Sequence, residues 1–104
     1  MDNFSVVITT CPGTDVAQPI IEALLQERLA ACIQVIPSVM SHYIWDGAVQ
    51  HDSEVLLIIK GMTENYKAIE DTIVRLHPYE VAEIIRLPIE AGLDKYLAWL
   101  TNPV

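Results

Sequence analysis

The sequence has few basic residues and no cluster of them. Lys and Arg together number 6, against 14 Asp and Glu, which gives a net charge of −8. Proteins that bind nucleic acid or anionic membranes need grouped positive charge, so this composition argues against both kinds of partner. A spread negative charge is compatible with attracting cations, but it also serves simply to keep a protein in solution.

Long apolar runs, paired cysteines and glycine-rich loops are also missing. No stretch reaches the about 20 apolar residues of a membrane helix. The N-terminus has no basic segment or cleavage pattern that marks a protein for export, so we expect a cytoplasmic location. Cys11 and Cys32 are far from a CxxC spacing, which favours free thiols. Without a Gly-rich phosphate loop, nucleotide binding has no support.

The first third of the chain predicts a strand followed by a helix. The chain has 104 residues, of which 52% are hydrophobic, enough for one globular domain spanning residues 1–104. Residues 3–10 are apolar and β-branched and predict a buried strand. Apolar residues then follow helical spacing from position 16 to position 29. Asp15 and Gln18 resemble a capping box in front of this helix, and Pro19 leaves its start open.

The second half predicts a helix, a strand and a short terminal helix. Thr63 is a plausible N-cap, and His77 must end the helix near Leu76 because the residue before a proline avoids helical geometry. Residues 83–89 form the next strand, in which Pro88 requires an edge or a bulge. A short helix then begins at Asp94. With the hairpin described next, the order is βαββαβ plus a helix, an α+β sandwich of the ferredoxin-like kind.

The longest extended segment, residues 32–61, predicts a hairpin that turns at Asp46-Gly47. Each arm has roughly 12 to 14 residues and is about 40–45 Å long, whereas a globule of this size is only about 35 Å across. The tip must therefore overhang, unless a bend at Pro37-Ser38 folds it back. An exposed aromatic ribbon invites pairing with another chain. We expect a closed homo-oligomer whose interface includes Tyr43, Ile44, Trp45 and Val49.

The predicted turn also places two histidines opposite each other. A two-residue Asp46-Gly47 loop sets His42 against His51 across the hairpin. Facing imidazoles suit a transition-metal ion, and they also repel each other when both are protonated. A third interpretation is an ordinary solvent-facing polar pair.

Four segments taken together resemble the CutA family of divalent-cation tolerance proteins. They cover nearly the whole chain in the family's order. The segments are "ERLAACIQVIPSVMSHYIWDG" (residues 27–47), "DSEVLLIIK" (52–60), "LHPYEVAEIIRLPIEAG" (76–92) and "YLAWL" (96–100). The resemblance implies a tight homotrimer with hairpins wrapped around neighbours and an architecture akin to the PII signalling proteins. It also implies a role in tolerance to copper and other divalent cations, and no established catalytic activity.

The resemblance further implies a metal site built from a cysteine, a histidine before Pro-Tyr and a glutamate. His77 and Glu83 match the last two positions, and Cys11 follows the usual cysteine position by one or two residues. Thiolate, imidazole and carboxylate suit Cu or Zn better than Mg or Ca. Structural interpretations stand beside this one: His77 as a helix-terminal residue, and Glu83 in a salt bridge with Arg75 or Arg86.

Two functions compete on this basis, and catalysis is not expected. The first is a trimer that binds Cu(II) or another divalent cation. The second is a PII-like regulatory module that binds a small ligand in a cleft between subunits. Neither the spacing of a Ser-His-Asp triad nor that of a Cys-His pair is present. Candidate cleft residues for the second function are Lys60, Glu54, Tyr79, Glu83 and Trp99.

Overall fold

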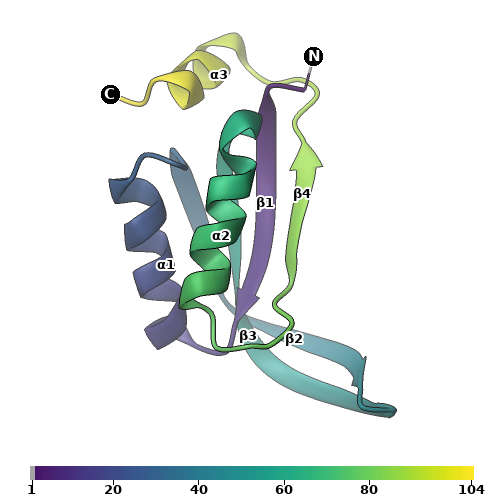
Figure 1. The fold of residues 1–104 in the computed structure, drawn as a ribbon. Coiled ribbons are helices and arrows are strands. Elements are labelled where there is room, and N and C mark those ends of the chain that lie inside the picture. The colour runs from purple at the N-terminus through teal and green to yellow at the C-terminus, as the bar shows by residue number, and fades with distance from the viewer. Residues whose placement is uncertain (1) are drawn as a thin grey trace.

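The computed structural model describes residues 2–104, which form a four-stranded antiparallel sheet and three α-helices (Figure 1). The order of the elements confirms the prediction of βαββαβ followed by a helix. The elements are β1 (Phe4–Cys11), α1 (Thr14–Gln26), β2 (Cys32–Trp45), β3 (Ala48–Met62), a 3₁₀ turn (Thr63–Asn65), α2 (Tyr66–Leu76), β4 (Ile84–Pro88) and α3 (Asp94–Thr101).

The sheet has the strand order β2-β3-β1-β4, so β3 and β1 are central and β4 lies at an edge. The edge position of β4 accommodates Pro88, which has no N–H for a further ladder bond. Helices α1 and α2 cover one face of the sheet (Figure 1). Alternate side chains of β1 and β3 pack against them to form the core, which includes Val7, Leu57 and Ile59 together with Ile20, Leu24, Ile69 and Ile73.

The opposite face of the sheet is apolar and only partly covered. Strand alternation and the pairing register place one row of side chains from every strand on this face. Ile85 and Leu87 are each 48% exposed there. Leu56 and Ile58 of β3 are therefore only partly buried, whereas Leu57 and Ile59 on the helix-covered face are buried. The hydrophobic members of the row are Val6, Ile8, Ile36, Leu56, Ile58, Ile85 and Leu87.

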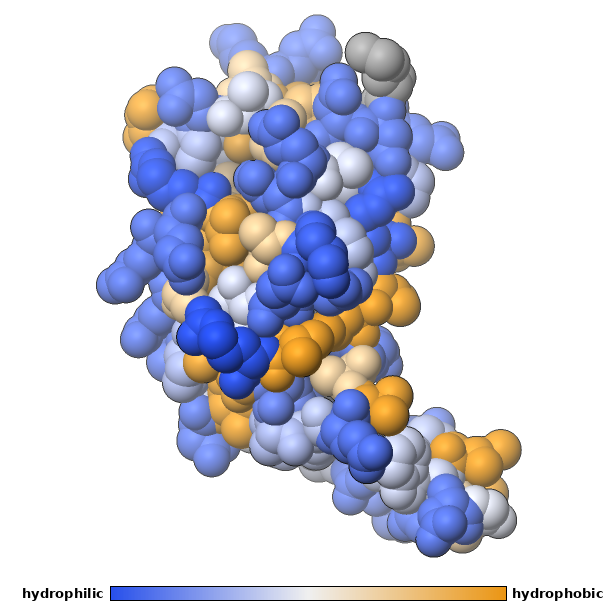
Figure 2. Space-filling view, in the orientation of Figure 1, coloured by the Kyte–Doolittle hydropathy of each residue, from blue (hydrophilic) through white to orange (hydrophobic). Residues whose placement is uncertain are grey.

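The hairpin of β2 and β3 extends well beyond the helices, as its length predicts (Figures 1 and 2). The pairing register is irregular between Ile36 and Val39, where Pro37 and Ser38 lie. The chain bends there but does not fold back over the body (Figure 1). The chain measures 45 × 25 × 23 Å along its principal axes. Hydrophobic residues are visible at the protruding end (Figure 2).

The predicted starts of α1 and α2 differ from the structure, whereas α3 begins at Asp94 as predicted. Asp15 lies inside α1, Gly13 is the N-cap and no side chain caps it, so the capping box is not formed. Gln18 instead donates to Glu22 one turn later, at 3.1 Å. Pro19 lies in the second turn, where it deprives the Asp15 carbonyl of its helical donor.

Thr63 begins a 3₁₀ turn rather than α2, whose N-cap is Asn65. Its hydroxyl lies 2.7 Å from that of Ser5 on β1. A tertiary hydrogen bond has therefore replaced the local cap.

Candidate functional site

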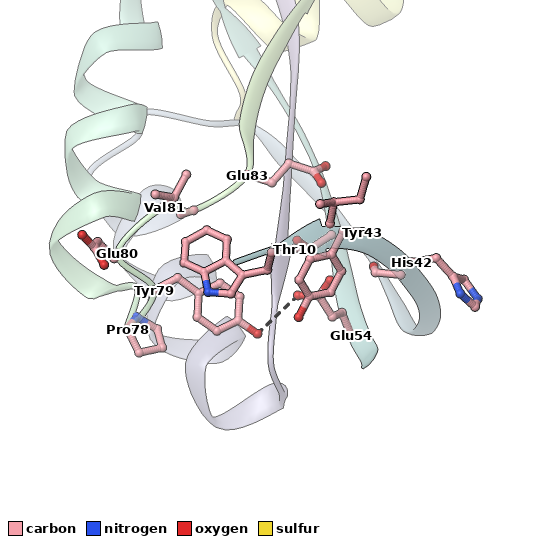
Figure 3. Close-up of a pocket in the computed structure, with 13 residues that line it drawn as sticks. Thr10, His42, Tyr43, Glu54, Pro78, Tyr79, Glu80, Val81 and Glu83 are labelled. Atoms are coloured by element: carbon pink, nitrogen blue, oxygen red, sulfur yellow. Dashed lines mark hydrogen bonds between the residues drawn. The ribbon is translucent and has the colours of Figure 1, made fainter. Parts of the chain in front are cut away.

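A cleft of about 800 Å³ lies between the protruding part of the hairpin and the segment that follows α2 (Figure 3). The bend at Pro37 and Ser38 directs the hairpin away from the body and so opens this space. The cleft combines aromatic rings with carboxylates. Its lining comprises Thr10 from β1, residues 41–45 from β2, Glu54 from β3 and residues 78–83.

His77 directly precedes the segment that lines the cleft, and the sequence explains its backbone conformation. Pro78 forces the preceding residue out of helical geometry, and His77 has φ −89° and ψ 136°, so α2 ends at Leu76 as predicted. The backbone N–H of Tyr79 donates to Nδ1 of His77 at 3.2 Å. Nδ1 is therefore unprotonated, and Nε2 carries the proton that it donates to the Thr10 carbonyl at 2.7 Å. Both ring nitrogens are occupied, and the side chain is buried.

Cys11 follows Thr10 directly but faces the hydrophobic core. It is fully buried, with 0% exposure. Burial, followed by the nearby charge of Glu54, raises the pKa of the Cys11 thiol to about 11. The thiolate is the form that binds metals, so Cys11 is a poor ligand in this conformation.

Glu54 and Tyr79 join the two sides of the cleft. The Tyr79 hydroxyl donates to Glu54 Oε2 at 3.4 Å (Figure 3). Glu54 is only 7% exposed, and it is paired with Val39 just beyond the irregularity in β2. Burial, followed by the charge of Glu54, raises the pKa of Tyr79. The phenol therefore stays protonated as a donor.

Glu83 lies at the exposed rim of the cleft. The salt bridge with Arg86 considered above does not form, because Arg86 instead pairs with Asp2 at 2.8 Å. No ion pair involves Glu83 among residues 2–104. Its carboxylate is thus available to a ligand.

The structure brings Cys11, His77 and Glu83 to the same end of β1 but does not present them together. Cys11 and His77 are buried, whereas Glu83 is exposed. Within residues 2–104, no three His, Cys, Asp or Glu side chains are grouped in a way that could hold a metal ion. The ligand set implied by the family resemblance therefore stays a prediction for the assembled protein or for another conformation of this corner.

Lys60 and Trp99 lie away from Glu54 and Tyr79 within one subunit. Six residues of β3 separate Lys60 from Glu54, which corresponds to roughly 20 Å. The Lys60 ammonium lies 5.8 Å from the centre of the Tyr96 ring, and that ring stacks on Trp99 with 5.8 Å between their centres. A gathering of all five predicted cleft residues would therefore require two subunits.

The hairpin has the predicted register through its Asp46-Gly47 turn, where Gly47 has φ 75°. His42 faces His51, and Ile44 faces Val49. Ile44 and Val49 are 77% and 76% exposed, and Tyr43 and Trp45 are also exposed.

Sequence reasoning did not identify Asp52 as a partner of Tyr43. The Tyr43 hydroxyl donates to the Asp52 carboxylate, and this bond raises the pKa of Tyr43 to about 12. Side chains alternate between the two faces of β2 and β3, and this alternation places Tyr43 and Asp52 on the same face. The sequence therefore contained a sign that the two could meet.

The chain is similar in sequence and in structure to proteins named CutA. The family described as CutA1 divalent ion tolerance protein matches residues 5–103. Protein CutA of Homo sapiens is 45% identical over 92% of this chain, which spans only 54% of that relative. The divalent-cation tolerance protein CutA of Thermus thermophilus is 44% identical over 91% of this chain and 92% of its own.

A solved structure of the divalent cation tolerance protein from Thermus thermophilus superposes with a TM-score of 0.91 over 94% of this chain and 95% of that chain, at 43% identity. An Arabidopsis thaliana relative named "Protein CutA, chloroplastic" is 42% identical over 93% of this chain and 53% of its own. Across residues 2–104, no helix combines the length and apolar character needed to span a membrane. The match over residues 5–103 shows that the chain belongs to the CutA1 divalent ion tolerance protein family.

Proposed function

We propose that the chain is a ferredoxin-like subunit of a homotrimer that binds Cu(II) or another divalent cation and takes part in tolerance to such ions. The observation that carries this proposal is the exposed Glu83 carboxylate at the rim of a cleft that also holds Glu54. The net charge of −8 adds a field that attracts cations. We assign the chain no catalytic role, no nucleic-acid partner and a cytoplasmic location, which stays a prediction.

Two surfaces of the subunit support assembly. The hairpin exposes Ile44 and Val49 almost completely, and a two-stranded ribbon is at best marginally stable in water by itself. The sheet face opposite α1 and α2 exposes Ile85 and Leu87. A closed ring of subunits covers both surfaces at once, because each hairpin then lies against a neighbour.

Glu83 is the first ligand in this proposal. His77 joins it only if the imidazole gives up its bonds to Thr10 and Tyr79, and Cys11 only if its buried thiol ionises. Each step costs free energy, so the ion must offset it, and a neighbouring subunit is the natural source of further ligands.

Calorimetric titration of the assembled protein with Cu(II) tests the ion site. Glu83→Gln keeps the side-chain shape and removes one charge. We expect it to weaken binding at this site at least about tenfold, which corresponds to about 1.4 kcal/mol. The matched control is Glu90→Gln, which removes an equally exposed charge further along the chain. Unchanged Cu(II) affinity in Glu83→Gln, or an equal loss in both variants, would remove Glu83 from the site.

Light scattering at micromolar chain concentration tests the homotrimer. The wild type should have three times the mass of the 11.6 kDa chain. Ile44→Glu combined with Val49→Glu should reduce that mass, because facing carboxylates cannot be buried without cost. Gln26→Glu on the exposed surface of α1 is the control and should leave the mass unchanged. A wild-type monomer contradicts the proposal.

A PII-like regulatory module is the second candidate, favoured by the aromatic lining of the cleft. Tyr43, Trp45 and Tyr79 line it beside Glu54, a combination typical of small-molecule sites. Trp45 lines the cleft, so the tryptophan fluorescence of the unmodified protein reports on a ligand that binds there. Saturable change on adding a small metabolite, in the absence of metal, supports this function. A fluorescence change with divalent cations but with no small metabolite supports the divalent-cation-binding function instead.

A further inference from the structure

We propose that His42 and His51 form a second metal site, which chelates a transition-metal ion such as Cu(II) across the β2–β3 hairpin. The two residues are direct cross-strand partners. Their ring centres are 5.8 Å apart, and the rings are inclined at 34°. Both side chains are exposed in the single chain, on the hairpin face that also carries Ile44 and Val49, so an ion reaches them from solvent where the neighbouring subunit leaves this face uncovered.

The separation of the rings fits a shared ion. A ring nitrogen binds Cu or Zn at about 2.0–2.1 Å, which places the ion about 3 Å from each ring centre. Two rings on one ion can therefore have centres up to about 6 Å apart, and a tetrahedral ion requires about 5 Å. The observed 5.8 Å lies within the first limit. Small rotations of two exposed side chains are enough to bring the ring centres to the separation of about 5 Å that a tetrahedral ion requires.

The backbone supplies the organisation that a two-ligand site needs. The Asp46-Gly47 turn fixes the register from Trp45 to Val39 without interruption, so His42 and His51 stay opposite each other. Directly opposed positions hold their Cβ atoms about 4.5–5.5 Å apart. Much of the entropy cost of bringing two ligands together is therefore already met by the hairpin.

His42 borders the cleft, but the histidine pair shares no ligand with the Glu83 site proposed there. The imidazole of His42 points away from Tyr43 and Glu54 (Figure 3). The remaining histidine of the chain, His77, has both ring nitrogens in hydrogen bonds. Neutral imidazole suits Cu, Zn and Ni, whereas Mg and Ca prefer oxygen ligands. We therefore expect binding in the order Cu(II) above Ni(II) and Zn(II), with no binding of Mg(II).

The test is a titration of the full-length, assembled protein with Cu(II), followed by calorimetry and electron paramagnetic resonance. The variants are His42→Gln, His51→Gln and the double variant. Each single substitution should weaken this site at least about tenfold, and the double should be little worse than either, because both ligands serve one ion. Gln50→Ala, on the opposite face of the same strand, is the matched control. The spectrum should show two coordinated nitrogens that are lost in both single variants.

Hydrogen exchange locates the ion independently of affinity. Bound Cu(II) or Zn(II) should slow amide exchange in residues 40–53 of the wild type, because it crosslinks the strands, and should have no such effect in the double variant. Glu83→Gln should leave this protection intact, which distinguishes failure of this site from failure of the cleft site. Protection unaffected by either histidine substitution would overturn the proposal. So would one ion per two chains with a rise in mass, which shows bridging between molecules.

Discussion

Replacing His77 by alanine should destabilise the protein markedly, because this side chain ties the end of α2 to the end of β1. The imidazole is 8% exposed and makes two hydrogen bonds, one to the Thr10 carbonyl and one from the Tyr79 N–H. Alanine leaves both backbone groups without that partner. A buried polar group that loses its partner costs about 1–3 kcal/mol, and truncating the ring also leaves a cavity. We expect a loss of about 2–4 kcal/mol in the free energy of unfolding per chain.

His77→Asn divides this cost between the two bonds. An Asn side chain accepts a hydrogen bond from the N–H two residues later, as in an Asx-turn, so the bond from Tyr79 is retained. The bond to the Thr10 carbonyl is lost, because the shorter side chain does not reach it. The expected loss is about half that of His77→Ala. His42→Ala is the exposed control and should change stability by less than about 0.5 kcal/mol.

Guanidinium unfolding at one fixed chain concentration measures these differences, since assembly makes apparent stability concentration-dependent. His77→Ala within about 0.5 kcal/mol of the His42→Ala control would refute the reasoning. The hydrogen bonds would then contribute little, and the imidazole would be free to turn towards an ion. The same measurement therefore bears on the metal site as well as on the fold.

Two further predictions concern the core. At pH 8, iodoacetamide should leave Cys11 unlabelled in the native protein and should label it after unfolding. Mass spectrometry of peptides measures this difference. The folded-state pKa of Cys11 is about 11, compared with an ordinary value of 9.0. The thiol therefore contributes its full stabilisation below pH 9 and loses it as the pH rises through 11. The fall in the free energy of unfolding over this pH range should be smaller in Cys11→Ala. Gly61→Ala should cost about 1–3 kcal/mol, because its Cβ would lie 3.0 Å from the Leu29 carbonyl oxygen. Gly92→Ala should cost less, because there a movable Leu97 side chain is the neighbour.

Local rules predicted the elements whose geometry depends on adjacent residues. Pro78 restricts His77 directly, so the end of α2 followed from two letters of sequence. The Asp46-Gly47 turn fixed the register of the hairpin for the same reason, including the opposition of His42 and His51. The overhang followed from strand length compared with globule size, which needs no knowledge of packing.

Interactions between distant residues were beyond such rules. Thr63 has the chemistry of an N-cap, but Ser5 on a neighbouring strand competes for its hydroxyl. The fact that His77 precedes Pro78 gave no indication that its ring would form a hydrogen bond to Thr10, 67 residues earlier in the chain. The separation of Lys60 from Glu54 could in principle have been predicted from the sequence, since six residues of strand span roughly 20 Å.

The two proposed ion sites differ in what they need from the rest of the molecule. His42 and His51 are opposed within one hairpin, so that site is complete in each chain. At the cleft, Glu80 and Glu83 are exposed without an ionic partner among residues 2–104, and two carboxylates are still short of the four or more ligands that a protein-bound cation usually takes. The remaining ligands must come from rearrangement of the His77 corner, from water or from a neighbouring subunit. If a neighbour supplies them, ion binding at the cleft stabilises the assembly by the same free energy by which assembly strengthens ion binding.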